Sequence, residues 1–260
     1  MSIKAYSNGK ESGIKVFVAD SYEALSVKAA TIVAGAIANK PNFLLGLATG
    51  TSPIGLYTEL AKLNQEGRVD FADVITYNLD EYYPIDPAND QSYRYFMDKH
   101  LFNKVNIKME NTHLLNGLAD DWKVECANYD AEIKSLGGID LQVLGIGNNG
   151  HIGFNEPGEE FIWETHRVEL TESTIIANSR LFNSADEVPR AALSMGIGNI
   201  MEAKQIVLVA NGKNKAAAIK AALEGQISPL CQASILKLHQ NVTFILDEDA
   251  ASALTEYKPL

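Results

Sequence analysis

Residues 145–157 combine a glycine-rich backbone with three side chains suited to proton chemistry: Asn149, His151 and Glu156. The apolar run that precedes them, within residues 139–146, predicts a buried strand of a parallel sheet. Open α/β sheets bind ligands just beyond the carboxyl ends of their strands, so this stretch is placed for catalysis. A glycine turn with an incidental histidine explains these residues equally well when they are taken alone. The glycines of the stretch are Gly145, Gly147, Gly150 and Gly153.

The same glycines match the dinucleotide-binding fingerprint Gly-x-Gly-x-x-Gly after a strand. That fingerprint also requires a helix that begins on the glycines and an acidic residue at the end of the next strand. Gly153 and Pro157 disfavour a helix at this point. We therefore expect no nicotinamide or flavin site.

A second candidate site follows the apolar residues 42–47, where a short turn opens a helix. Glycine lets a backbone approach an oxyanion closely, and the unpaired amides of a first helical turn attract negative charge. The turn predicts a phosphate-binding loop, although a helix cap without a ligand has the same residues. It lacks the Lys-Ser/Thr ending of a Walker loop, which argues against ATP hydrolysis. The turn consists of Thr49, Gly50, Thr51, Ser52 and Pro53.

Two adjacent carboxylates, Asp80 and Glu81, come at the end of a strand predicted over residues 74–79. Side chains alternate along a strand, so only one of them can face a bound ligand. A carboxylate in a dehydrated pocket can remove a proton from a carbon next to a carbonyl. A solvated acidic turn explains both carboxylates without a ligand, and for Glu81 alone we favour that interpretation or a structural ion pair.

Two basic residues lie in later turns: Arg180 after residues 171–176, and Lys215 in the turn 211–215. Arginine suits bidentate binding of phosphate, and lysine supplies a point charge. A solvated side chain is the simpler interpretation of either residue alone. Their presence beside a predicted phosphate loop favours an anion-binding role.

The bulk properties narrow the function classes. The chain has 260 residues, a formal charge of −11 and 46% apolar residues, which fits one α/β domain over residues 1–260 and argues against nucleic-acid binding. No apolar run reaches the length of a membrane span, and the N-terminus does not resemble a signal peptide. Cys126 and Cys231 have no metal or redox spacing. We expect a cytoplasmic protein with two reduced thiols.

Apolar runs typical of strands alternate with segments typical of helices along the whole chain. This alternation predicts a single-domain α/β fold, a Rossmann-like, mostly parallel sheet with helices on both faces. Predicted strands cover residues 14–18, 42–47, 74–79, 139–146, 168–170, 205–209 and 242–246, and predicted helices cover residues 21–38, 54–63, 93–100, 120–136, 197–202 and 213–223.

The motifs at 47–53, 78–82, 145–157 and 178–180, together with the Lys215 turn, occur in an order that resembles the glucosamine-6-phosphate deaminase family. Members are also called glucosamine-6-phosphate isomerases. The resemblance extends from about residue 14 to residue 250. It implies that glucosamine 6-phosphate and water become fructose 6-phosphate and ammonia, without a metal or an organic cofactor. The implied partner is a small amino-sugar phosphate. The sequence leaves open whether the protein forms a homo-oligomer.

The resemblance also implies a role for each candidate residue. Thr49, Gly50, Thr51, Ser52, Arg180 and Lys215 would hold the 6-phosphate. His151, oriented by Glu156, would open the sugar ring. Asp80 would then move a proton from C2 to C1 through an enolamine.

One position departs from well-known members of the family, which have an aspartate where this chain has Asn149. An amide can orient His151 by hydrogen bonding but carries no charge. We therefore expect Glu156 to supply most of the assistance to ring opening that an aspartate gives in those members. Asn149→Asp should then alter the rate only modestly. The acidic residues around Glu160 replace the basic residues of allosterically activated relatives, so we expect no strong activation by N-acetylglucosamine 6-phosphate.

Three other functions stay open on sequence alone. An isomerase for galactosamine 6-phosphate would keep the same residues. A 6-phosphogluconolactonase would use His151 as a hydrolytic base and would not need Asp80 as a carbon base. A sugar-phosphate sensor shares this type of fold but would need a DNA-binding segment, which the sequence does not contain.

Overall fold

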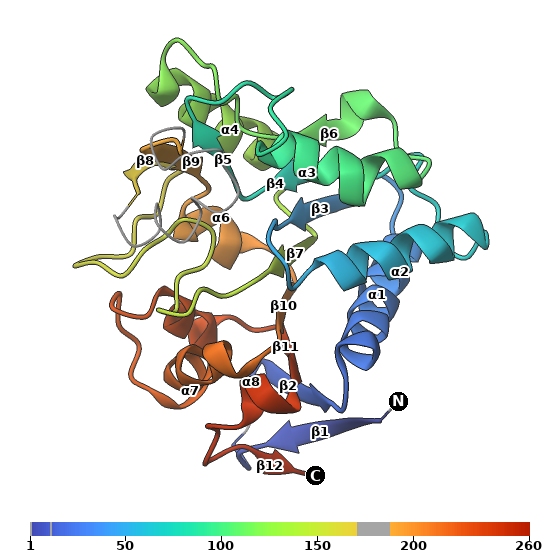
Figure 1. Ribbon diagram of the computed structural model, residues 1–260, viewed down its shortest axis with the longest axis vertical. Helices are drawn as coiled ribbons and strands as arrows, with labels where there is room; N and C mark the ends of the chain where they lie inside the picture. Colours follow the sequence, from blue (N-terminus) through green and yellow to red (C-terminus); the bar gives the residue numbers. More distant parts are fainter. Residues whose placement is uncertain (1, 11, 171–187) are drawn as a thin grey trace.

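The computed structural model describes residues 2–10, 12–170 and 188–260, and its centre is one nine-stranded sheet (Figure 1). The strands lie in the order β12-β1-β2-β11-β10-β7-β3-β4-β6, with β1 antiparallel to β2 and to β12, and all other neighbours parallel. A mostly parallel α/β sheet is therefore confirmed. The strands are β1 (Ile3–Ser7), β2 (Ile14–Ala19), β3 (Leu44–Leu47), β4 (Ile75–Asn78), β6 (Thr112–His113), β7 (Leu141–Leu144), β10 (Ile206–Ala210), β11 (Val242–Asp247) and β12 (Lys258–Pro259).

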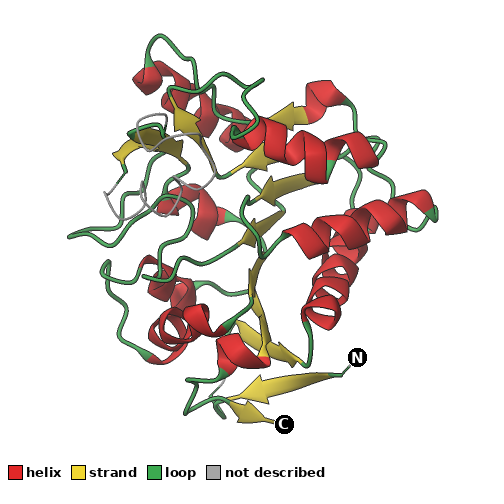
Figure 2. Ribbon diagram, in the orientation of Figure 1, coloured by secondary structure: helices red, strands yellow, loops and turns green. Residues whose placement is uncertain are grey.

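Helices cover both faces of this sheet, as predicted. In Figure 1, α1 and α2 lie on one side of the central strands and α6 and α7 on the other, and Figure 2 shows the same arrangement by element type. The α-helices are α1 (Tyr22–Ala38), α2 (Ile54–Gln65), α3 (Tyr93–His100), α4 (Trp122–Ser135), α6 (Ile197–Glu202), α7 (Ala216–Glu224) and α8 (Glu248–Ala251), and the 3-10 helices are η1 (Phe102–Lys104), η2 (Met109–Asn111), η4 (Lys213–Lys215) and η5 (Gln232–Leu238).

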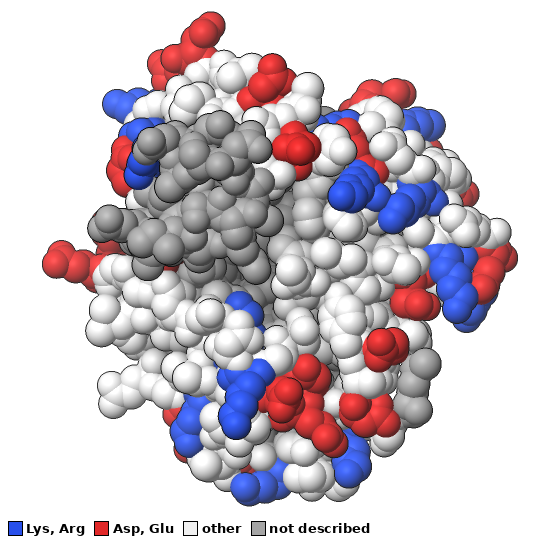
Figure 3. Space-filling model, viewed as in Figure 1, with Lys and Arg blue, Asp and Glu red and all other residues white. Residues whose placement is uncertain are grey.

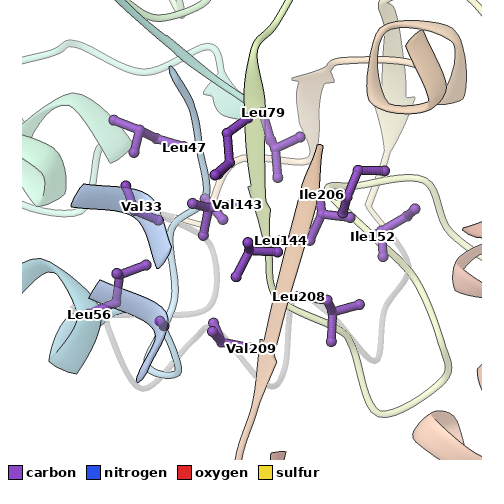
Figure 4. Packing of buried hydrophobic residues seen from close by; sticks show 14 of the residues in the cluster. Val33, Leu47, Leu56, Leu79, Val143, Leu144, Ile152, Ile206, Leu208 and Val209 are labelled. Atoms are coloured by element: carbon purple, nitrogen blue, oxygen red, sulfur yellow. The ribbon is translucent and has the colours of Figure 1, made fainter. Parts of the chain in front are cut away.

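The central strands are apolar on both sides because helices cover both faces. All five residues of β10 and all four of β7 are buried. Figure 4 shows Val143 and Leu144 of β7 and Leu208 and Val209 of β10 in this core. Runs of mostly apolar residues are the pattern that predicted these strands from the sequence.

The strand order reverses between β3 and β7. After β3 the chain continues to β4 and β6 on one side, and after β7 it continues to β10 and β11 on the other. Loops at such a switch point diverge and leave a crevice at the carboxyl edge of the sheet. The predicted phosphate loop follows β3 and the His151 loop follows β7, so they flank this position.

A second, antiparallel sheet was not predicted. It contains β5 (Asp80–Tyr83), β9 (Ala191–Ser194) and β8 (His166–Glu169), in the order β5-β9-β8. The chain passes from β4 into this sheet at Leu79, whose N–H donates to Leu47 in the large sheet. The polar turn expected after residue 79 is therefore wrong, because pairing with β9 makes that segment a buried strand.

Candidate active site

The loop after β7 folds around the imidazole of His151. The backbone N–H of Gly147 donates to the His151 carbonyl at 2.9 Å, and that of Gly150 donates to the Gly147 carbonyl at 3.0 Å. Gly150 has φ of +88°, which favours glycine. A methyl group at Gly147 would lie 2.3–2.5 Å from three imidazole atoms, so the ring packs directly on this glycine. The turn confirms that no helix begins on these glycines, as we expected on rejecting a dinucleotide site.

The carboxylate of Glu156 joins the two polar side chains of the loop. Its Oε1 lies 3.1 Å from Nδ1 of His151, which is an ion-pair distance, although these two atoms form no hydrogen bond in this conformation. The side-chain amide of Asn149 donates to Oε2 of Glu156 at 2.7 Å. The Asn149 side-chain oxygen accepts the backbone N–H of His151 at 3.2 Å.

Asn149 hydrogen-bonds to both partners of the pair. Its side chain links the carboxylate of Glu156 to the backbone of His151. The His151 side chain keeps 29% of its surface exposed, and that of Glu156 keeps 12%. The imidazole therefore faces solvent on one side and a carboxylate on another, which suits a group that gives and takes a proton.

Asp80 lies beside the same loop. It is 6% exposed, and a methyl group at Gly153 would lie 3.5 Å from its Oδ2. Burial, and then the neighbouring carboxyl of Glu81, raise the pKa of Asp80 to about 8. A carboxylate with so little solvation is a stronger base than one in water.

Glu81 has a structural position. It is 2% exposed and accepts backbone N–H groups from Tyr82, Tyr93 and Arg94 at 2.9, 2.8 and 3.0 Å. Tyr93 and Arg94 open α3, where a carboxylate also meets the positive end of the helix. Burial raises the pKa of Glu81 to about 7. The expected solvated turn or ion pair is wrong, because the carboxyl is enclosed and bound by backbone amides.

The turn after β3 presents unpaired amides. Gly50 has φ of +97°, and the backbone N–H groups of Gly50, Thr51 and Ser52 donate to no other described residue. The hydroxyl of Ser52 donates to Oδ1 of Asn211 at 2.7 Å, so it must leave Asn211 before it can donate to a ligand. The amides therefore fit an anion better than this hydroxyl does.

The turn after β10 is tied to both of the other loops. Asn211 holds Ser52, and the side-chain amide of Asn214 donates to Oδ1 of Asn148 at 3.1 Å. Sequence reasoning did not assign functions to these asparagines, although their position after a buried strand, in the turn that contains Lys215, was a signal for one.

Lys215 lies in this turn as a half-buried cation. It forms no ion pair with any residue that the structure describes. Burial lowers the pKa of its ammonium group. An anionic ligand beside it would supply the missing charge partner. In Figure 3 this face of the molecule is hollowed near its centre, and charged side chains lie mostly around its periphery.

Asp80 is also next to the phosphate loop. The N–H of Leu79, the residue before Asp80, donates to the Leu47 carbonyl at 2.9 Å, so the end of β4 lies beside the end of β3. The hydroxyl of Tyr57 bonds to Ala48 at the start of the loop. Burial chiefly raises the pKa of Tyr57, and the carboxyl of Asp80 adds to it. The structure thus brings the loops after β3, β4, β7 and β10 to one edge.

The remaining predictions concern Arg180, the two cysteines, metal ligands and membrane-spanning segments. Arg180 lies outside the described residues. Cys126 and Cys231 are free and buried, which confirms two unpaired thiols. Across residues 2–10, 12–170 and 188–260, no group of three His, Cys, Asp or Glu side chains is arranged to hold a metal ion. In the same ranges, no helix has both the length and the apolar character needed to cross a membrane.

Comparison with known proteins identifies relatives that match most of the chain. A glucosamine-6-phosphate deaminase of Thermoanaerobacter sp. (strain X514) is 54% identical over 243 residues, which cover 94% of this chain and 96% of that protein. One of Clostridioides difficile (strain 630) is 54% identical over 247 residues, which cover 94% of this chain and 99% of that protein. The similarity is thus nearly end to end.

Solved structures are similar to this chain as well. A structure described as a monomeric glucosamine-6-phosphate deaminase has a TM-score of 0.89 at 45% identity, and the match covers 92% of this chain and 99% of that one. A 6-phosphogluconolactonase from Thermotoga maritima has a TM-score of 0.70 at 18% identity over 90% of this chain and 98% of that one, which shows a shared fold alone. A family model described as glucosamine-6-phosphate isomerases/6-phosphogluconolactonase matches residues 19–244. The chain therefore belongs to the glucosamine-6-phosphate isomerase/6-phosphogluconolactonase family.

Proposed function

We propose that this protein converts glucosamine 6-phosphate and water into fructose 6-phosphate and ammonia. The observation that carries the proposal is the position of Asp80, a buried carboxyl beside the loop that holds the His151–Glu156 pair. Relatives that are 54% identical over most of the chain bear the name glucosamine-6-phosphate deaminase. A carbon base next to an imidazole–carboxylate pair is the set of groups that this reaction needs.

The phosphate is the part of the substrate that does not react, and it serves as the anchor. In this proposal the unpaired amides of Gly50, Thr51 and Ser52 bind it, with Lys215 as the charge partner. Thr49 and Arg180 complete the set on the ground of the family resemblance. Binding energy at the phosphate holds the sugar carbons at the reacting groups.

Ring opening is the first chemical step. His151 takes the proton of the anomeric hydroxyl and gives a proton to the ring oxygen, so that the C1–O5 bond breaks and an aldehyde forms. The carboxylate of Glu156 stabilises the imidazolium that exists between the two transfers. Asn149 holds this carboxylate in place.

Isomerisation and deamination follow. Ionised Asp80 takes the proton at C2, which the aldehyde makes acidic, and the electron pair forms the C1–C2 double bond of an enolamine. The π pair of the C1–O1 bond moves to O1, which takes a proton from water. Protonation at C1 by the carboxylic acid of Asp80 gives an imine at C2. Water adds to that carbon and ammonia leaves, which yields fructose 6-phosphate.

An ammonia-release assay with glucosamine 6-phosphate tests the proposal. We expect turnover by the wild-type protein and a loss of about 10³-fold or more in kcat for Asp80→Asn. Asp90→Asn, on the exposed loop that follows β5, is the matched control and should retain wild-type turnover. Hydrolysis of 6-phosphogluconolactone without ammonia release from the amino sugar would contradict the proposal.

A further inference from the structure

The hydroxyl of Tyr22 lies at the back of the phosphate loop, although the two are far apart in sequence. Tyr22 is the first residue of α1, and its hydroxyl lies 3.0 Å from the carbonyl oxygens of both Thr51 and Ser52. The backbone N–H of Gly55, in the first turn of α2, donates to the same hydroxyl at 2.8 Å. The Tyr22 hydroxyl therefore contacts two residues of the phosphate loop and one residue in the first turn of the helix that follows it.

The peptide group between Thr51 and Ser52 makes this contact relevant to the ligand. Its C=O and N–H point in opposite directions because the peptide is planar and trans. A C=O held by Tyr22 turns the Ser52 N–H away from α1, and that N–H donates to no other described residue. The Thr51 carbonyl also accepts the backbone N–H of Ile54 at a longer 3.4 Å, so a residue on another helix makes the shorter of the two contacts that orient this anion-binding amide.

The packing of α1 against α2 keeps the hydroxyl in place. A methyl group at Gly55 would lie 2.0 Å from Oγ of Ser26 and 3.0 Å from Cε1 of Tyr22, so only glycine permits this approach. The hydroxyl of Ser26 donates to the Tyr22 carbonyl at 2.7 Å. Tyr22 is therefore tied to α1 at its backbone and to the phosphate loop at its hydroxyl.

We propose that Tyr22 is a positioning residue of the phosphate-binding loop, which aims the Ser52 N–H at the anion through its bond to the Thr51 carbonyl. This inference rests on the phosphate-binding part of the proposed function. It assigns a role in substrate affinity to a residue that acts through the loop and does not take part in the proton transfers.

Tyr22→Phe removes only the hydroxyl and tests the inference. We expect KM for glucosamine 6-phosphate to rise about 5- to 20-fold with kcat within about twofold of wild type, because the amide binds ground state and transition state alike. Tyr83→Phe is the matched control, since the Tyr83 hydroxyl also donates to a backbone carbonyl, that of Ala119, at 2.9 Å. The control should leave KM unchanged.

Binding of inorganic phosphate, measured by calorimetry without turnover, separates this inference from the proposed reaction. We expect Kd for phosphate to rise in Tyr22→Phe by the same factor as KM, whether or not wild-type protein releases ammonia. An unchanged Kd with a lowered Tm would show a purely structural role and overturn the inference. A wild-type protein that binds no phosphate would overturn it as well.

Discussion

The side-chain amide of Asn149 donates to Oε2 of Glu156 at 2.7 Å. This bond leaves Oε1 of the same carboxylate beside Nδ1 of His151. The three side chains form a chain of contacts in which the carboxylate is central and the amide is peripheral. In the proposed reaction Asn149 would act on the imidazole through Glu156, beside its own hydrogen bond to the His151 backbone, and substitutions at position 149 should affect the carboxylate first.

Asn149→Asp replaces the donor with a second carboxyl next to Glu156. Two carboxyls at this distance share a proton, so the pair keeps a hydrogen bond while it is singly protonated and repels when both ionise. We expect kcat within about tenfold of wild type at mildly acidic pH and a steeper fall than wild type as pH rises. The pH dependence of kcat measures this.

Asn116→Asp is the control for that variant, because the Asn116 side-chain oxygen accepts the Leu118 N–H in an exposed turn, and an aspartate can do the same. A pH profile of Asn149→Asp that ran parallel to wild type but about 10²-fold lower at every pH would mean that Asn149 acts on the substrate directly.

Gly147→Ala tests whether the imidazole packs on the loop backbone. Its methyl group would lie 2.3–2.5 Å from three atoms of His151, so the ring must move. We expect kcat to fall about 10²-fold, since small displacements of catalytic groups have large effects on rate. The control is Gly145→Ala, where no atom lies within 4 Å of the added methyl group. Equal activities of the two variants would refute the packing.

Lys215→Met tests the charge partner of the phosphate. We expect KM to rise about 10- to 100-fold with little change in kcat, because the phosphate anchor does not react. Tm should stay the same or rise, because methionine fills the space of a half-buried cation that no described residue pairs with. Lys213→Met, at an exposed position in the same turn, should match wild type. A similar rise in KM for both variants would indicate a general charge effect.

Asp80 makes stability depend on pH. Its pKa is about 8 in the folded state, above its ordinary value, so the native protein binds this proton more tightly than the unfolded chain does. The stability from the protonated carboxyl is full below about pH 4 and is lost as pH rises through about 8. Asp80→Asn should therefore raise Tm relative to wild type near pH 8, and the difference should shrink toward pH 4. Thermal unfolding across this range checks the sign, and a lower Tm for the variant at pH 8 would contradict it.

The sequence was sufficient to predict the strands that support the site. β3, β7 and β10 consist mostly of apolar residues, and each is followed by a polar turn that the structure places at one edge. The positions of the candidate catalytic motifs could be predicted for the same reason, because each motif directly follows one of the predicted strands.

Contacts between segments that are distant in the chain could not be predicted from the sequence. Asp80–Tyr83 carries polar side chains and becomes a strand only because Ala191–Ser194 pairs with it. The bonds from Ser52 to Asn211 and from Tyr22 to Thr51 likewise depend on packing that no local pattern encodes. For Glu81, adjacency to Asp80 suggested solvent exposure, whereas the N-terminus of α3 encloses it.

The central claim is that Asp80 moves the proton from C2 to C1 of a sugar held at the phosphate loop. The most direct measurement is turnover of glucosamine 6-phosphate in deuterium oxide, followed by NMR of the product. Wild-type protein should give fructose 6-phosphate in which part of the new hydrogen at C1 is protium carried over from C2, and Asp80→Asn should give neither this product nor ammonia while it still binds inorganic phosphate with wild-type affinity. Fructose 6-phosphate formed by Asp80→Asn at a rate within about tenfold of wild type would show that another group is the carbon base.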